Sequence, residues 1–333
     1  MAEERSRRPP DLAPLASAAP NDHRLCPFCP GHEAVTAQEI YAVRNHGSNA
    51  NDPGWSLRVI PNKYAVLHIE GELNRSGDGI YDTMNGVGAH EVVIETPQHD
   101  ARMGQYGQAR MEMLIRAYRD RSIDLHRDQR FKYVQIFRNY GQVAGALIDH
   151  PHSQIIALPI APRWVKEELG NAREHFDYKE RCLFCDIVNQ ELKDRSRIVF
   201  ENQTMLAFTP FASKFPFETW ILPKAHSHDF QFIADGDIAP LAEALRVTLY
   251  GIQMALEDPP FNFIIHGAPR LGPAANAGIQ REYHWHIEII PRVTRLAGFE
   301  WGTGFYINPT LPEKAADFLR QVLLEQPAPA LAE

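Results

Sequence analysis

One pattern of cysteines, histidines and apolar stretches occurs twice along this chain in the same order, which limits the folds that the chain can adopt. Cys26-Pro-Phe-Cys29 begins the first copy and Cys182-Leu-Phe-Cys185 begins the second. Each copy continues with an apolar stretch, a proline closely followed by a histidine, and a later His-x-His triplet. These elements are Val92–Ile94, Pro97, His99 and His150-Pro151-His152 in the first copy, and Trp220–Leu222, Pro223, His226 and His284-Trp285-His286 in the second. Matched elements in one order indicate an internal repeat.

Each copy is expected to combine strands with a helix. Residues about 102–120 and about 238–256 carry apolar side chains near helical spacing, and the apolar stretches around them are typical of strands. Residues 162–176 are predicted to form a linking helix, and a final helix follows Pro312, because proline suits the first helical turn. This order predicts an α+β fold with two antiparallel-sheet halves flanked by helices. The predicted halves are residues 1–165 and residues 166–333, and the second includes the final helix.

Composition narrows the classes of partner. The net charge of −8 argues against a nucleic-acid-binding protein, which would normally present a basic surface. No stretch approaches the 18 or so apolar residues of a membrane span, so no membrane association is expected. The charged stretch Met1–Pro10 lacks the apolar core of a signal peptide, which predicts a cytoplasmic protein. In a reducing compartment, two Cys-x-x-Cys pairs are more often metal sites than disulfides.

The two cysteine pairs predict two metal sites. Each pair supplies two thiolates, and a tetrahedral zinc ion needs two further ligands. Thiolates combined with imidazoles favour Zn²⁺ over Mg²⁺ or Ca²⁺. The predicted sets are Cys26, Cys29, His99 and His150 in the first half, and Cys182, Cys185, His226 and His284 in the second. Rival ligands are His32 for the first site, and His266 and Glu168 for the second.

The segment Asp149-His150-Pro151-His152-Ser153-Gln154 predicts the chemistry. Residues two apart on a strand share a face, so a metal-bound His150 would place His152 accurately. A neutral imidazole is a competent nucleophile toward phosphorus, which would split one displacement into two. Gln154 could donate its amide hydrogen to a phosphoryl oxygen. The second copy has Glu288 in the matching position, whose carboxylate would repel a phosphate, so one active His-x-His is predicted per chain.

These motifs closely resemble those of the galactose-1-phosphate uridylyltransferase family, within the histidine-triad superfamily, and also those of its ADP-glucose phosphorylase-like branch. The resemblance runs from about Arg5 to the C-terminal helix. Its most specific parts are the His-Pro-His-Ser-Gln motif, Pro216–Lys224 and Ala297–Gly304.

The resemblance implies a duplicated histidine-triad fold, a homodimer, and a uridylyl-histidine intermediate on His152 that is steadied by Gln154. It places phosphate-binding arginines at Arg5 and Arg8, a nucleotide-contacting residue at Asn62 and a phosphate neighbour at Asn139. The implied first zinc site is the set already given. Some family members build the second metal site on a glutamate and three histidines, which match Glu168, His266, His284 and His286 in this chain. Others use a second cysteine pair, and the second cysteine pair is the prediction here.

Three departures from the family pattern affect the expected activity. A serine near the departing phosphate is replaced by Leu147, and a glutamine that contacts the sugar phosphate in the partner's site is replaced by Tyr306. The expected N-terminal strand before Arg5 is either missing or lies upstream of the start used here. The predicted reaction, in galactose and carbohydrate metabolism, is UMP transfer between the nucleotide sugar UDP-glucose and galactose 1-phosphate. The alternatives are an ADP-glucose phosphorylase-like adenylyltransferase, a nucleotide hydrolase or a catalytically weak nucleotide-binding protein.

Overall fold

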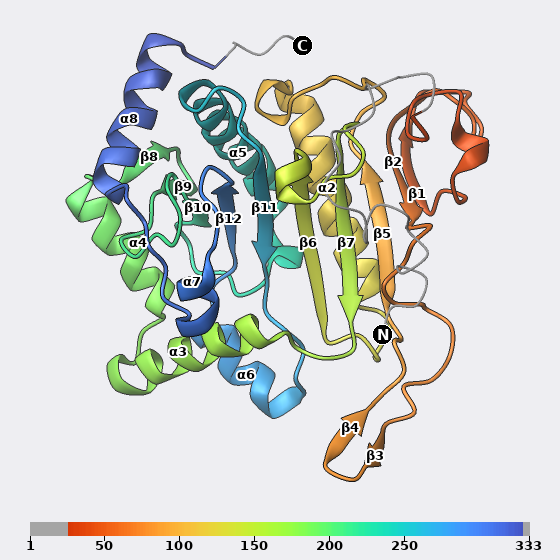
Figure 1. Cartoon of the computed structure of the whole chain (residues 1–333), viewed down its shortest axis with the longest axis horizontal. Coiled ribbons are helices and arrows are strands. Elements are labelled where there is room, and N and C mark those ends of the chain that lie inside the picture. Colours follow the sequence, from red (N-terminus) through yellow and green to blue (C-terminus); the bar gives the residue numbers. More distant parts are fainter. Residues whose placement is uncertain (1–25, 329–333) are drawn as a thin grey trace.

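The computed structural model describes residues 26–328, and these form a mixed α/β structure built on one large sheet (Figure 1). Arg5 and Arg8 lie outside the described residues. The sheet has ten strands in the order β1-β2-β5-β7-β6-β11-β12-β10-β9-β8, and every neighbouring pair is antiparallel. The predicted combination of antiparallel strands and flanking helices is therefore confirmed.

The strands divide between the two halves of the chain. The first half contributes β1 (Tyr41–Arg44), β2 (Trp55–Pro61), β5 (Ala89–Ile94), β6 (Tyr133–Tyr140) and β7 (His152–Leu158). The second half contributes β8 (Ile198–Glu201), β9 (Met205–Phe208), β10 (Thr219–Pro223), β11 (Phe261–His266) and β12 (His286–Pro291). A separate hairpin of β3 (Ser76–Asp78) and β4 (Tyr81–Thr83) projects from the body of the molecule (Figure 1).

The two halves share one strand order, read outward from the centre of the sheet. From β6 the order is β7, β5, β2 and β1, and from β11 it is β12, β10, β9 and β8. The halves join where β6 pairs with β11, for example at Ile136↔Ile265. This pairing closes two strand edges that would otherwise expose unpaired backbone groups. The two predicted sheets are therefore two parts of one continuous sheet.

Helices α2 (Gln108–Leu125) and α5 (Asp235–Ala255) pack on one face of the sheet and form the main core with it. The strands contribute every second side chain to this core, because alternate side chains of a strand point to the same face of the sheet. Val93, Ile155 and Phe263 are examples, and each is fully buried. Helix α8 (Pro312–Glu325) adds Ala316 and Leu319 to this core. All three helices lie close to their predicted positions.

The opposite face of the sheet is covered differently in the two halves. Over β8–β12 it packs against α3 (Arg163–Lys179), α4 (Leu183–Asp194) and α6 (Pro273–Glu282). In the first half, the matching face packs against the segment that begins with Cys26 and Phe28. Helix α3 is the predicted linking helix, extended by three residues. Short 3₁₀ turns occur at Glu33–Val35, Met103–Gln105, Gln142–Ala144 and Phe230–Phe232.

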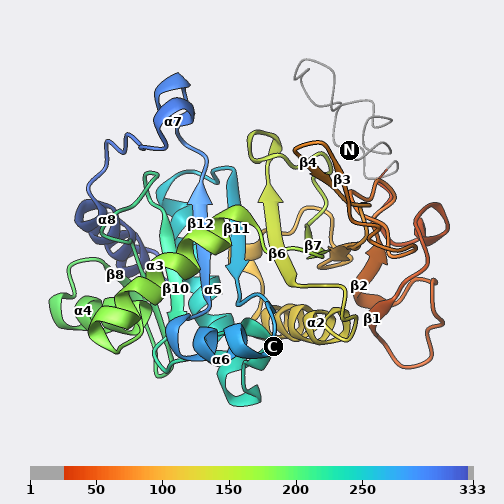
Figure 2. The ribbon, with the colours of Figure 1, turned by 90° about the horizontal axis from the view of Figure 1, so that it is seen from below.

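Helix α7 (Gly298–Thr303) projects away from the sheet, on the segment that links β12 to α8 (Figure 2). This segment exposes several large apolar side chains, namely Phe299, Trp301, Phe305, Ile307 and Leu311. Among the helices described, none has both the length and the apolar composition needed to cross a bilayer.

Candidate active site and metal centres

His152 is the first residue of β7, and its ring orientation is set by the backbone just before it. Its Nδ1 lies 2.8 Å from the carbonyl oxygen of His150. A carbonyl oxygen can only accept, so Nδ1 carries the proton and the lone pair is on Nε2. This is the tautomer that a nucleophilic imidazole requires. The side chain is 9% exposed, and its ring packs edge-on against Phe28.

The strand that carries His152 is held from the helix-covered face of the sheet. Ser153, the next residue, accepts a 2.7 Å hydrogen bond from the Tyr118 hydroxyl on α2, and both side chains are fully buried. The backbone N–H of Glu95 donates to the carbonyl of Pro151 at 3.2 Å. These contacts lie directly before and after His152 in the sequence, so they restrict its backbone on both sides.

Gln154 lies on the same face as His152, as the alternation of β7 predicted. Its Oε1 is 2.8 Å from Nε2 of His90 on β5 and 3.5 Å from Nδ2 of Asn62, which follows β2. The structure therefore brings Asn62 and Gln154 together. Sequence reasoning missed His90, although a histidine two residues before the apolar stretch Val92–Ile94 was a visible signal.

Asn139 lies on β6, two residues beyond the Phe137↔Gln154 pair and therefore at the level of His152. Its Oδ1 accepts a 2.9 Å hydrogen bond from Nδ2 of Asn262 on β11. Asn139 and His152 line one cavity of about 270 Å³, which also reaches the turn before β7 at Ala146 and Ile148. The predicted phosphate neighbour and the predicted nucleophile thus share a cavity.

A second cavity, of about 620 Å³, lies between the start of β5 and the segment that follows β2. Asn62 and His90 line it, and both of these residues contact Gln154. Its other walls include Leu67, Leu125 and Phe131, so the lining combines polar and apolar groups. A mostly apolar cleft with a few oriented polar groups is typical of a ligand site.

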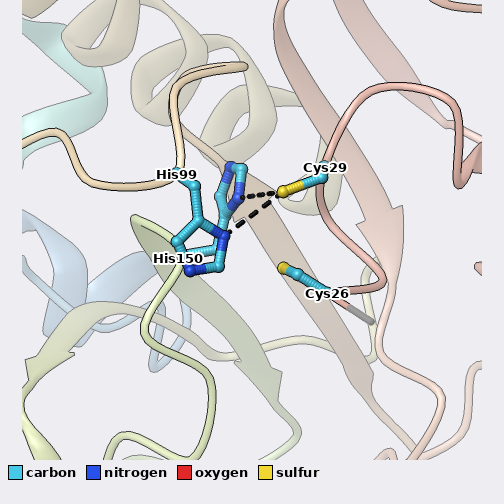
Figure 3. A group of neighbouring side chains, drawn as sticks. All are labelled: Cys26, Cys29, His99 and His150. Atoms are coloured by element: carbon cyan, nitrogen blue, oxygen red, sulfur yellow. Dashed lines mark hydrogen bonds between the residues drawn. The ribbon is translucent and has the colours of Figure 1, made fainter. Parts of the chain in front are cut away.

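The four residues of the first predicted metal site come together, with ligand atoms within 4.8 Å of one another (Figure 3). Sγ of Cys29 lies 3.2 Å from Nδ1 of His99 and 3.6 Å from Nδ1 of His150. Nε2 of His150 donates to the Thr96 carbonyl at 2.8 Å, which leaves Nδ1 as the ligand atom. Burial lowers the pKa of His150 to about 4, so its imidazole is neutral, as metal binding requires.

The rival ligand of this site, His32, is directed elsewhere. Its Nδ1 lies 2.6 Å from the backbone carbonyl oxygen of Cys26, and it is not part of the cluster. In the absence of a cation, burial and the neighbouring Cys26 raise the pKa of the Cys29 thiol to about 12. A divalent cation would supply the positive charge that a buried thiolate needs here.

The second predicted set repeats this geometry. Cys182, Cys185, His226 and His284 also have all their ligand atoms within 4.8 Å. Sγ of Cys185 lies 3.3 Å from Nδ1 of His226 and 3.6 Å from Nδ1 of His284. Nε2 of His226 donates to the Gln280 carbonyl at 2.9 Å, so Nδ1 again faces the sulfur atoms. Both clusters therefore fit a tetrahedral metal ion with two sulfur and two nitrogen ligands.

A third cluster contains Glu168, His266, His286 and Glu288. It differs from the alternative set considered from the sequence, because His284 faces Cys185 and Glu288 occupies the remaining place. His266 lies between the two carboxylates, 3.3 Å from Glu168 and 3.4 Å from Glu288. Burial alone would lower its pKa, but these carboxylates raise it to about 10. The cluster is therefore already held together by ionic contacts among its own members.

The second His-x-His triplet is enclosed by other side chains, whereas the first borders a cavity. Strand register places Glu288 opposite Ile264, just as Gln154 lies opposite Phe137, so Glu288 does occupy the position of Gln154. The His286 ring stacks on His266 at 4.6 Å and on Trp220 at 4.9 Å, and His286 is fully buried. An acidic, ring-packed environment of this kind is unsuited to a phosphate.

Two family models match this chain. "Galactose-1-phosphate uridyl transferase, N-terminal domain" matches residues 10–162, and "Domain of unknown function (DUF4921)" matches residues 88–329. ADP-glucose phosphorylase from Arabidopsis thaliana is 35% identical over 324 residues, which cover 96% of this chain and 88% of that protein. Galactose-1-phosphate uridylyltransferase from Thermotoga maritima is 29% identical over 279 residues, which cover 81% of this chain and 86% of that protein. The crystal structure of the Arabidopsis phosphorylase with bound ADP-glucose superposes with a TM-score of 0.78 and 34% identity, covering 93% of this chain and 94% of that chain.

Proposed function

This chain belongs to the galactose-1-phosphate uridylyltransferase family, near its ADP-glucose phosphorylase branch, and we propose that it transfers a nucleoside monophosphate through a covalent intermediate on His152. The family relationship makes it a hexose-1-phosphate nucleotidyltransferase. The observation that carries the proposal is the His152–His150 contact, which leaves Nε2 as the nucleophilic atom at the edge of a cavity.

The proposed reaction has two displacements at one phosphorus atom. In the first, Nε2 of His152 forms a bond to the α-phosphorus of a nucleoside diphosphate hexose. The bond to the bridging oxygen breaks, and hexose 1-phosphate leaves with the electron pair. In the second, a phosphate oxygen of the acceptor attacks the same phosphorus and the P–N bond breaks. The proton stays bonded to Nδ1 of His152, which donates it to the His150 carbonyl oxygen in a hydrogen bond throughout, and neither step uses water.

The two cavities suggest how the donor lies. The 620 Å³ cavity beside Asn62 and His90 would hold the nucleoside, and the 270 Å³ cavity beside Asn139 would hold the departing phosphate and hexose. The transferred phosphoryl group would then sit over His152 and Gln154. The amide of Gln154 would stabilise the charge that develops on its oxygens.

Both Cys2His2 clusters are proposed to bind zinc, which supplies a rigid tetrahedral link between its four ligands. In the first cluster, His150 would then be fixed at the residue whose carbonyl orients His152. In the second, the ligands Cys182 and Cys185 on the α4 segment would be tied to His226 and His284, next to the sheet. The first site would thus support the chemistry and the second the fold.

We assign the donor on the similarity of the relatives. The ADP-glucose phosphorylase is 35% identical over 96% of this chain, so ADP-glucose with orthophosphate as acceptor is the first candidate. UDP-glucose with galactose 1-phosphate is the second, because several relatives bear the uridylyltransferase name. The exposed apolar side chains around α7 support a homodimer that would cover them.

Intact mass spectrometry after mixing the protein with ADP-glucose, and separately with UDP-glucose, tests this function without any acceptor. An added mass of one AMP, absent in His152→Ala, would support adenylyl transfer. An added mass of one UMP, equally absent in that variant, would support uridylyl transfer. Zinc-loaded protein that forms no adduct with either donor would overturn the proposal for both.

A further inference from the structure

His90 connects the backbone of Val66 to the side chain of Gln154 through two hydrogen bonds, and the backbone donor fixes the direction of both. The backbone N–H of Val66 points at Nδ1 of His90, at 3.2 Å. A backbone N–H can only donate, so Nδ1 is an acceptor and the proton of the neutral ring is on Nε2. Nε2 lies 2.8 Å from Oε1 of Gln154 and therefore donates to it.

Asn62 supports the same direction. Its Oδ1 accepts from the backbone N–H of Tyr64 at 2.9 Å, so its Nδ2 group is the one that faces His90 and Gln154. Nδ2 lies 3.1 Å from Nε2 of His90, but both atoms are donors, so this is a contact and not a hydrogen bond. Nδ2 is also 3.5 Å from Oε1 of Gln154. Two donors thus converge on one oxygen atom.

The hydrogen bonds of His90 exclude the reversed orientation of the Gln154 amide. If its NH₂ group faced His90, Nε2 would have to accept and Nδ1 would have to carry the proton. Nδ1 would then face the Val66 N–H, donor against donor. With its oxygen held by His90, the Gln154 amide has its two N–H bonds directed away from His90. Those N–H bonds are the donors that a phosphoryl group needs.

We propose that His90 is a positioning residue of the reaction, which selects the orientation of the Gln154 amide so that its NH₂ group is presented to the transferred phosphoryl group. The proposal rests on the function proposed above, because it assigns a partner to Gln154. His90 is 6% exposed, and its own carbonyl accepts from the Asn62 N–H at 2.8 Å, so the donor is held rigidly. His90 also lines the cavity assigned to the nucleoside.

Two variants with side chains of nearly equal size test this role, because one can donate a hydrogen bond to Gln154 and the other can only accept one. In His90→Gln the new amide can accept from Val66 and still donate to Gln154. In His90→Glu the carboxylate can only accept, which would turn the Gln154 amide around. The readouts are the single-turnover rate of adduct formation on His152, the donor KM and the melting temperature. We expect His90→Gln to stay within about fivefold of wild type, and His90→Glu to lose about 10²-fold in rate with little change in KM.

The same substitutions in a Gln154→Ala background separate positioning from a general structural role. If His90 acts through Gln154, His90→Glu causes less than about a twofold further loss in that background. Equal rates for the Gln and Glu variants, or losses that multiply with Gln154→Ala, would overturn the proposal. Wild-type protein serves as the reference, because a wild type that forms no adduct would refute the proposed function instead of the role of His90.

Discussion

The Nδ1 atom of His152 lies 2.8 Å from the backbone carbonyl oxygen of His150, so the residue that orients the His152 ring also extends its own side chain into a cysteine-histidine cluster. The matching contact in the second half joins His286 to His284, at 3.3 Å. Both halves thus share this backbone contact, but the ring of His286 is enclosed by His266 and Trp220.

Replacing each of the two matching histidines with alanine should give opposite results. His152→Ala should slow adduct formation by at least about 10³-fold, because the nucleophilic atom is removed. His286→Ala should form adduct at nearly the wild-type rate, since His286 is enclosed by His266 and Trp220. Rapid mixing followed by intact mass spectrometry measures both. Loss of adduct in a folded His286→Ala protein would contradict the assignment of one active half.

The two cysteine clusters should differ in their effect on the reaction. Cys29→Ser and Cys185→Ser are each expected to lose one equivalent of zinc, measured by elemental analysis. Cys29→Ser should also slow adduct formation by about 10- to 100-fold, because His150 would be less firmly held. Cys185→Ser should lower the melting temperature while the adduct rate stays within a few-fold. Equal rate losses in both variants would show that the clusters do not have separate roles.

Leu147→Ser should accelerate the release of hexose 1-phosphate. Leu147 is 40% exposed in the loop before β7, so a serine there replaces an exposed apolar side chain. A hydroxyl near the departing phosphate could add one hydrogen bond and raise the single-turnover rate up to about tenfold. Val143→Ser, in the same loop and 60% exposed, is the matched control. An unchanged rate in Leu147→Ser would place residue 147 outside the reach of the departing group.

Asp229 should make the protein less stable as the pH rises. Burial raises the pKa of Asp229 from 3.8 to about 6, despite hydrogen bonds from Gln231. The folded state therefore holds this proton more tightly than the unfolded chain. Its contribution to stability is present below the unfolded pKa, and about 3 kcal/mol is lost as the pH rises through the folded pKa.

Asp229→Asn cannot titrate, so its free energy of unfolding should rise relative to that of wild type between pH 4 and pH 7. Urea unfolding of both proteins at the two pH values measures this difference. Asp317→Asn, on the exposed side of α8, is the control and should keep the wild-type pH dependence. Parallel pH profiles for wild type and Asp229→Asn would refute the prediction.

The projecting segment around α7 should hold two copies of the chain together. Trp301 is 76% exposed, and Trp301→Ser should shift sedimentation toward monomer at micromolar concentration, because large exposed aromatic side chains dominate interface energies. Tyr178→Ser, equally exposed on α3, should leave the assembly unchanged. A wild-type protein that sediments as a monomer would exclude the homodimer.

Relationships that depend on local geometry and on repetition could be predicted from the amino-acid sequence. The alternation of a strand placed His152 and Gln154 on one face without knowledge of the fold. The repeated order of cysteines and histidines predicted two metal sites of four residues each, and these eight residues do lie in two clusters. The prediction was possible because thiols and imidazoles repeated in this pattern are typical of metal ligands. Glu288 was matched to Gln154 by the same repeat.

Contacts between residues on different strands could not be predicted in this way, because they depend on how the strands pair. His90 reaches Gln154 because β5 pairs with β7 in one register and the turn after β2 brings Val66 to the far side of the ring. Glu288, not His284, completes the cluster around His266 for the same kind of reason. A shift of one residue in either pairing would turn those side chains to the opposite face. Register is set by the packing of the whole sheet, so no short motif contains it.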